Sequence, residues 1–239
     1  YVLDLNSGYY ILYDEYNFSS ESEFWLHSPA ERLTSDSTTV RFQGPDAALD
    51  VHLVEPIAPV SRSGAVRTTA GLTRFLAMES PGGRYHVVVH PRGPDNRPLR
   101  IGRPAPGVIR IREPGGWFVY ALDKENRRHR DFWRGMAIDA AIAGVRKSGR
   151  VFNAFLVSGR SLSFAGFTIQ SDTPVALQLD EDERLTAHLA GHPAQARVRI
   201  DGRRLRGRRL DIPSQPGRRI EGSSVEILLL PGVEQFAIE

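Results

Sequence analysis

Hydrophobic and polar residues alternate with a period of two along most of the chain, the pattern of half-buried β-strands. Two runs rich in aromatic and β-branched residues come first, at 9–16 and 23–28, and we expect these two strands to pair across the polar turn segment between them. The same pattern predicts further strands at 39–43, 48–54, 73–78, 85–90, 108–112, 117–121, 139–146, 151–158, 161–164, 167–171, 175–179, 184–190 and 196–200. Turns rich in Gly and Pro separate many of them, as in antiparallel β proteins.

Two segments do not show a clear strand pattern. Residues 91–106 are rich in Pro and Gly, and because Pro lacks an amide donor we predict a surface loop there. Residues 137–144 have a composition that a short helix could use, but neither flank offers a convincing cap, so a strand is favoured.

The predicted fold is all-β: a multi-stranded antiparallel β-sandwich of layered sheets with little or no helix. No segment has the 3.6-residue period of an amphipathic helix of normal length. A chain of 239 residues can form such a sandwich as one domain. We assign residues 1–200 to the sandwich and 201–239 to its closing strands, with an Arg-rich turn between these strands and a tight hairpin at Asp201-Gly202.

The composition excludes several classes of protein. No apolar run approaches the roughly 18 residues needed to cross a bilayer, so we expect no membrane span. The absence of cysteine excludes disulfides and thiolate metal sites and leaves the compartment unmarked. The first residues have no initiator Met and no signal-peptide pattern, and they already alternate like a strand. We therefore interpret the chain as a piece of a longer one, with removal of a signal peptide before Tyr1 as the alternative.

Arginine supplies 29 of the 31 basic residues, since Lys124 and Lys147 are the only lysines. Such a bias usually reflects coding, but guanidinium groups also suit bidentate binding of carboxylate or sulfate, as on an acidic polysaccharide. Five arginines fall within residues 203–209. Because no aromatic residues flank them for base stacking, we expect a solvated turn and no nucleic-acid partner.

Common catalytic signatures, such as a phosphate loop, a nucleophile elbow or a His-Glu-x-x-His helix, are absent. Asp14 and His27 lie on two neighbouring predicted strands, and a carboxylate with an imidazole suits Zn²⁺. Two ligands do not make a site, and a half-buried histidine with one hydrogen bond is the commoner arrangement.

The other histidines offer no clearer metal site. His86 and His90 share a strand face but lie about 13 Å apart by strand rise, too far to share one ion. His52, His188 and His192 lie in or beside polar strand ends and are predicted to be surface residues.

Aromatic residues could stack on sugar rings, although in β proteins most of them fill the core. The clearest candidates lie in and beside the charged segment 123–135, which is either a solvated loop or the lip of a binding site. The candidate lip consists of Trp117, Tyr120, Arg127, Arg128, Arg130 and Trp133.

Several motifs together resemble the C-terminal β-sandwich of heparinase II/III-like polysaccharide lyases. They are Gly8–Asp14, Phe24–His27 and Ala48–Pro56, followed by Asp139-Ala140, Phe155–Gly159, Leu162 and Ser171–Val175. The likeness covers about residues 1–200 and is a pattern of strand motifs rather than a sharp signature.

The resemblance implies a periplasmic or secreted enzyme that cleaves an acidic, uronate-containing polysaccharide by β-elimination. In that family an α-helical toroid precedes the sandwich and carries the Tyr and His that transfer protons. No part of this chain matches the toroid, so its catalytic residues are unknown and the chain alone is expected to be inactive. The rival hypothesis is a non-catalytic carbohydrate-binding or adhesion module.

The resemblance also implies a structural Zn²⁺ in the intact protein. Several family members hold it with a His upstream of the first motif and with an Asp and a His that align with Asp14 and His27. The upstream His would fall before Tyr1.

Overall fold

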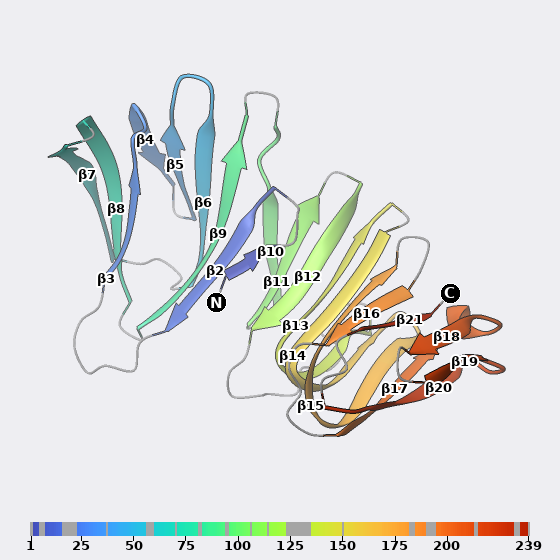
Figure 1. The fold of residues 1–239 in the computed structure, drawn as a ribbon. Coiled ribbons are helices and arrows are strands. Elements are labelled where there is room, and N and C mark those ends of the chain that lie inside the picture. Colours follow the sequence, from blue (N-terminus) through green and yellow to red (C-terminus); the bar gives the residue numbers. More distant parts are fainter. Residues whose placement is uncertain are drawn as a thin grey trace. The chain divides into compact units, whose positions relative to one another are not determined.

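The computed structural model describes residues 2–4, 8–15, 23–36, 38–55, 60–69, 71–80, 83–93, 96–105, 107–113, 115–122, 135–149, 151–181, 185–189, 195–212, 215–231 and 235–238. The predicted fold class is confirmed, because the chain is nearly all strand and the sheets are antiparallel. Within these ranges the one helix is the short 3₁₀ turn η1 (Arg203–Leu205), and none is long and apolar enough to cross a bilayer. The chain divides into two compact units, residues 1–99 and 100–239 (Figure 1).

The first unit is a sandwich of a six-stranded and a three-stranded sheet. The larger sheet has the order β1 (Val2–Asp4), β2 (Tyr10–Glu15), β9 (Arg84–Arg92), β6 (Ala48–Glu55), β5 (Thr39–Gln43), β4 (Arg32–Ser35). The smaller has the order β3 (Glu23–Ser28), β8 (Gly71–Glu79), β7 (Val60–Thr68). Alternate residues of both sheets share one core, in which Leu76 and Met78 of β8 belong with Val51 of β6 and Val87 of β9.

The predicted pairing of 9–16 with 23–28 is wrong. β2 pairs with β1 and β9, whereas β3 pairs with β8, so the two strands lie in different sheets. Each strand contributes one face to the same core from opposite layers: Leu12 from β2, and Phe24 and Leu26 from β3. Alternation shows that a strand has an apolar face but does not show which sheet receives it.

The second unit is built on one twelve-stranded sheet. Its main path is β10 (Arg100–Ala105), β11 (Val108–Glu113), β12 (Gly116–Leu122), β13 (Ala137–Ser148), β14 (Val151–Phe164), β15 (Phe167–Glu181), β16 (Leu185–Leu189), β21 (Gln235–Ile238), β18 (Arg209–Ile212), β19 (Gln215–Arg219). Off this path, β17 (Ala196–Gly202) pairs with β15 and with β20 (Ser224–Leu229).

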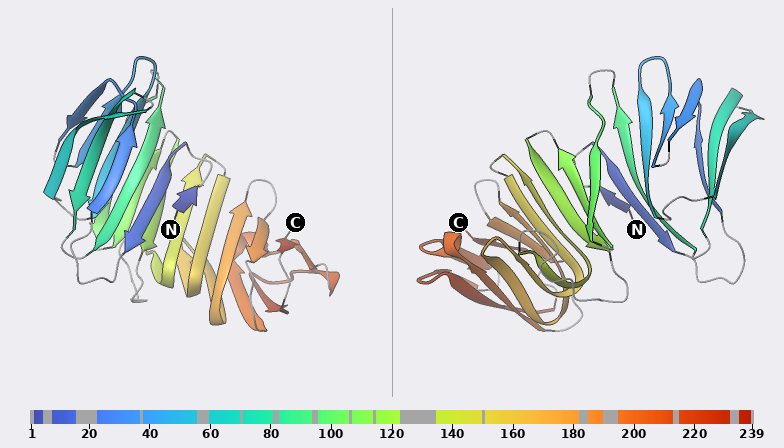
Figure 2. Two further views of the ribbon diagram at one scale, coloured as in Figure 1. Left: turned by 60° about the vertical axis from the view of Figure 1, so that its left-hand side comes forward. Right: turned by 180° about the vertical axis from the view of Figure 1, so that it is seen from behind.

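The long strands of this sheet bend, so that two parts of the same sheet enclose one core. The first half of β14 pairs with the end of β15, and its second half pairs with the start of β15, with register shifts between the halves. Beyond the bend, the start of β15 pairs with β17, while its end pairs with β16. Core residues come from both parts, including Leu156 and Leu162 on either side of the bend. The curl of these strands is visible in Figure 2.

The structure tests the two segments whose sequence pattern was ambiguous. The strand favoured over a helix at 137–144 is confirmed as part of β13. The loop predicted at 91–106 is wrong at both ends, because residues 91 and 92 belong to β9 and Arg100–Ala105 forms β10. Among the described residues β10 pairs with β11 alone and its register is irregular after Gly102, and such an edge tolerates Pro104.

The predicted hairpin at Asp201-Gly202 is also wrong. Both residues end β17, where they pair with the start of β15, and the chain turns only after η1, at Gly207 with φ 84°. Residue 200, which the sequence analysis places between the sandwich and its closing strands, lies inside β17.

Candidate functional site

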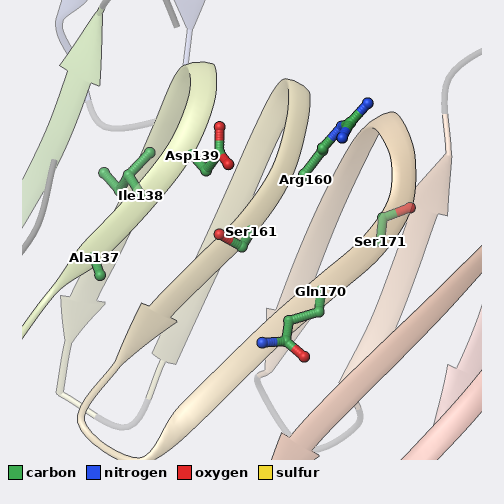
Figure 3. A pocket seen from close by; sticks show the side chains of 7 residues that line it. All are labelled: Ala137, Ile138, Asp139, Arg160, Ser161, Gln170 and Ser171. Carbon is green, nitrogen blue, oxygen red and sulfur yellow. The ribbon is translucent and has the colours of Figure 1, made fainter. Parts of the chain in front are cut away.

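A polar pocket lies on the second unit where three neighbouring strands bend (Figure 3). Its volume is about 380 Å³, and it is lined by Ala137, Ile138, Asp139, Arg160, Ser161, Gln170 and Ser171. Asp139 of β13, Ser161 of β14 and Gln170 of β15 are cross-strand partners, so their side chains form a row on one face. Four of their sequence neighbours, Ile138, Ala140, Leu162 and Ile169, belong to the core, which leaves this row on the outer face.

Close packing at Gly159 maintains the bend beneath the pocket. A Cβ atom on Gly159 would lie only 2.4 Å from Cβ of Ala140 and 2.8 Å from Cδ1 of Leu156, so no larger residue fits there without movement. Ser158 has a positive φ of 50°, and the pairing of β14 shifts register around it. Arg160 is the extra residue between the pairs Ala140–Gly159 and Asp139–Ser161, and a bulge of this kind redirects its side chain.

The pocket contains polar groups that are available to a ligand. Among the described residues, no hydrogen bond or ion pair is made to Arg160, whose side chain is exposed. Among the described residues the Ser171 hydroxyl also has no hydrogen-bond partner, but its oxygen is buried, so the side chain must turn before it can reach a ligand. Because a guanidinium binds carboxylates and hydroxyls bind sugars or water, the pocket suits a polyhydroxylated acid.

The polar row continues beyond the pocket. Gln170 lies opposite Arg199 of β17, and Arg199 lies opposite Glu226 of β20. Five strands at the usual spacing span about 19 Å. Side-chain hydrogen bonds from Arg199, at 3.0 to 3.1 Å, lower the pKa of Asp201 and favour its charged form. Because the polar row runs across five strands, an extended polar ligand could contact several of them.

The first unit exposes an aromatic surface on the outer face of β3 and β8. The Trp25 ring stacks on the His27 ring at 5.7 Å and lies 5.2 Å from Phe75 between ring centres. Trp25 is 42% exposed, and the Arg62 guanidinium lies 5.5 Å from the centre of its ring. Such a surface can stack on the apolar face of a sugar, and the charge of Arg62 is compensated by its ion pair with Glu23.

A charged cluster is buried at the centre of the six-stranded sheet. Asp50 is fully buried, and Arg41 donates to both of its carboxylate oxygens at 2.6 and 3.1 Å. Arg92 Nε lies 2.7 Å from Asp50 Oδ2 in a second ion pair, without the alignment of a hydrogen bond. Burial raises the pKa of Asp50, but the Arg41 hydrogen bond and the charges of both arginines outweigh this effect and lower it.

Two histidines lie beside this carboxylate. His90 is the cross-strand partner of Asp50, and His52 lies two residues along β6 from Asp50 on the same face. Burial lowers the pKa of both imidazoles, so the neutral forms are favoured. The prediction that His52 is a surface residue is wrong, because β6 lies inside the sheet between β5 and β9. The side chains of His188 and His192 lie outside the described residues.

The structure places the predicted metal pair on two different sheets. Asp14 lies opposite Tyr85 of β9, on the face of the six-stranded sheet that contributes to the core, and its Oδ1 accepts the Glu15 amide at 3.0 Å. His27 lies on the outer face of β3, with its ring stacked on Trp25. The core and the β3 backbone therefore separate the two side chains, and the described residues do not assemble them into one site.

The predicted sugar-binding lip is described only in part. Trp117 is half-buried and packs edge-on against Phe164, and Tyr120 is fully buried with its ring stacked on Phe118. These contacts give both rings a packing role, and their contact with sugar stays a prediction. The remaining members, Arg127, Arg128, Arg130 and Trp133, lie outside the described residues.

No protein-family model and no curated protein matches the sequence. Sequence reasoning did not single out the Arg160 pocket, because its residues come from three strands that meet only through the register at the bend. The polar residues Asp139, Ser161 and Gln170, one on each strand, were the available signal in the sequence, but polar residues mark any solvent-facing strand.

Proposed function

We propose that this chain is the β-sandwich portion of a polysaccharide lyase that cleaves an acidic, uronate-containing glycan by β-elimination. Its own part in the reaction is to bind the glycan. The base and acid for β-elimination come from an α-helical toroid, and the protein acts in the periplasm or outside the cell. The motif resemblance suggests the reaction, and the Arg160 pocket is the observation that supports glycan binding.

The pocket matches a uronate in three respects. Arg160 can hold the carboxylate through two parallel hydrogen bonds. Ser161 and Gln170 offer a hydroxyl and an amide group to the sugar hydroxyls. The polar row that runs on to Arg199 gives neighbouring sugars further partners across the strands.

Calorimetric titration tests the binding step. The probe is an oligosaccharide of alternating glucuronate and N-acetylglucosamine, and its control is the same oligosaccharide with reduced carboxyl groups. Because a charge-assisted hydrogen bond contributes about 1.5 to 3 kcal/mol, Arg160→Gln should weaken binding of the acidic probe at least about tenfold. Arg110→Gln, an exposed arginine of β11, should bind like the wild type.

Equal affinity for the acidic and the reduced probe would refute the assignment of Arg160. The role of the toroid has a separate test, which follows the ultraviolet absorbance of the unsaturated uronate that β-elimination produces. The chain alone should bind the acidic probe without producing this absorbance. Steady product formation by the purified chain would contradict the division of roles.

The exposed Trp25 surface favours a second candidate, a non-catalytic carbohydrate-binding module. In that case Trp25→Ala should abolish binding, the reduced probe should bind as well as the acidic one, and Arg160→Gln should have no effect. The same titrations therefore separate the two functions.

A further inference from the structure

Within the part of the chain that the structure describes, two buried imidazole nitrogens of the six-stranded sheet have no hydrogen-bond partner. His52 Nε2 and His90 Nδ1 are both without a hydrogen bond, and the two residues are only 9% and 7% exposed. An unsatisfied buried polar atom costs about 1 to 3 kcal/mol, so unpaired atoms of this kind are rare in folded proteins. Two of them beside the same carboxylate indicate a shared ligand.

The backbone brings three metal-ligating groups together at this point. Asp50 and His90 face each other across β6 and β9, and His52 follows Asp50 on the same face. One ligand atom from each of the three residues lies within 4.8 Å of the others. Bonds of 2.0 to 2.2 Å to a tetrahedral ion place ligand atoms about 3.4 Å apart, a distance that small side-chain rotations reach.

We propose that Asp50, His52 and His90 bind one Zn²⁺ or another divalent transition metal ion that prefers imidazole, with water as the fourth ligand. This site shares no residue with the Asp14 and His27 pair that the family resemblance implies. It is also independent of glycan binding by the Arg160 pocket, which lies in the other unit.

Neighbouring groups already orient two of the three ligands. His52 Nδ1 lies 3.2 Å from the Thr39 hydroxyl oxygen, and when Nδ1 donates to it the lone pair of Nε2 is left for the metal ion. Arg41 fixes the plane of the Asp50 carboxylate through two hydrogen bonds. Partners of this kind are common around ligating histidines and carboxylates.

The charges at the site determine which ions it selects. Asp50 contributes one negative charge and Arg41 and Arg92 contribute two positive charges, so the surroundings oppose a cation. Ca²⁺ and Mg²⁺ depend on several oxygen ligands and on negative charge, and they should not bind. Zn²⁺, Co²⁺ and Cu²⁺ gain from bonds to imidazole nitrogen and can bind despite the arginines.

Metal analysis of the chain tests the proposal. After treatment with a chelator, the wild type should take up about one Zn²⁺ per chain in equilibrium dialysis and show a higher melting temperature, with no response to Mg²⁺. His52→Gln and His90→Gln should each weaken Zn²⁺ binding at least about tenfold. His86→Gln is the matched control, because His86 is buried on the same face of β9 but lies outside the group, and it should bind like the wild type.

Failure of the wild type to bind Zn²⁺, or equal loss in the His86 variant, would overturn the proposal. If the ligand variants do not fold, Co²⁺ bound to the wild type gives the answer through its visible spectrum. Intense bands of a four-coordinate ion should develop up to one equivalent. A spectrum unchanged from that of hydrated Co²⁺ would exclude the site.

Discussion

Replacing Asp50 with Asn removes the carboxylate that forms ion pairs with two buried or half-buried arginines. The side chain of Asp50 is fully buried, that of Arg92 is 11% exposed, and that of Arg41 is 38% exposed. In Asp50→Asn both guanidinium groups lose their carboxylate partner. Arg41 can turn toward water, but Arg92 remains largely enclosed with its charge uncompensated.

The size of the effect follows from this difference in exposure. Breaking a buried ion pair by removing one partner costs about 3 to 5 kcal/mol. Because Arg41 can recover hydration, we expect the lower end, about 3 kcal/mol. Small domains are stable by only about 5 to 15 kcal/mol, so the first unit should lose a large part of its stability.

Urea unfolding in the presence of a chelator measures this loss without any contribution from bound metal. Glu226→Gln is the control, since its ion pair with Arg197 is exposed on both sides and should contribute less than about 1 kcal/mol. Hydrogen exchange should increase in peptides of β6 and β9 in Asp50→Asn. A loss below about 1 kcal/mol, or exchange unchanged in these strands, would refute the view that the buried carboxylate holds the arginines in place.

Three further changes test other parts of the structure. Amide hydrogen bonds from Thr38 and Thr39 lower the pKa of Asp36 below 3.8, so the wild type should melt above Asp36→Asn at about pH 6, and the difference should shrink as the pH falls through the lowered pKa; an equal difference at about pH 3 would contradict this. A Cβ on Gly144 would lie 2.8 Å from the Phe155 ring, so Gly144→Ala should destabilise the second unit by about 1 to 3 kcal/mol in thermal unfolding, whereas an unchanged melting temperature would show that the ring can move. Burial and the Glu15 carboxylate raise the pKa of Tyr13 to about 12, so the tyrosine that ionises at the highest pH in an ultraviolet titration should be missing in Tyr13→Phe. If this phase remains in the variant, it belongs to a different tyrosine.

The sequence predicted where the strands lie better than which strands pair with one another. Strands such as β6 and β9 alternate regularly, and a period of two is enough to find them. β7 was missed because Val60–Thr68 is rich in Ser, Arg and Gly, as an edge strand with an exposed face can be. Pairing depends on which apolar faces meet in the core, and for β2 and β3 the nearest strand along the chain was not the partner.

Both candidate sites depend on the register between neighbouring strands, which the alternation of hydrophobic and polar residues within one strand does not reveal. His52 and His90 are 38 positions apart and were treated as unrelated, but β6 and β9 are neighbours and bring both to Asp50. Similarly, Arg160 is the extra residue of a bulge, next to the close approach of Gly159 to Ala140. A glycine in a strand can signal a bulge, but its partner across the sheet is visible only in the folded chain.

The proposed function requires that the bent face of β13, β14 and β15 binds the acidic glycan. Backbone NMR of the chain during titration with the glucuronate oligosaccharide locates the binding surface. Shift changes should concentrate at Asp139, Arg160, Ser161, Gln170 and Ser171, with little change around Trp25. Saturable changes confined to β3 and β8, or no change at any concentration of the acidic oligosaccharide, would contradict it.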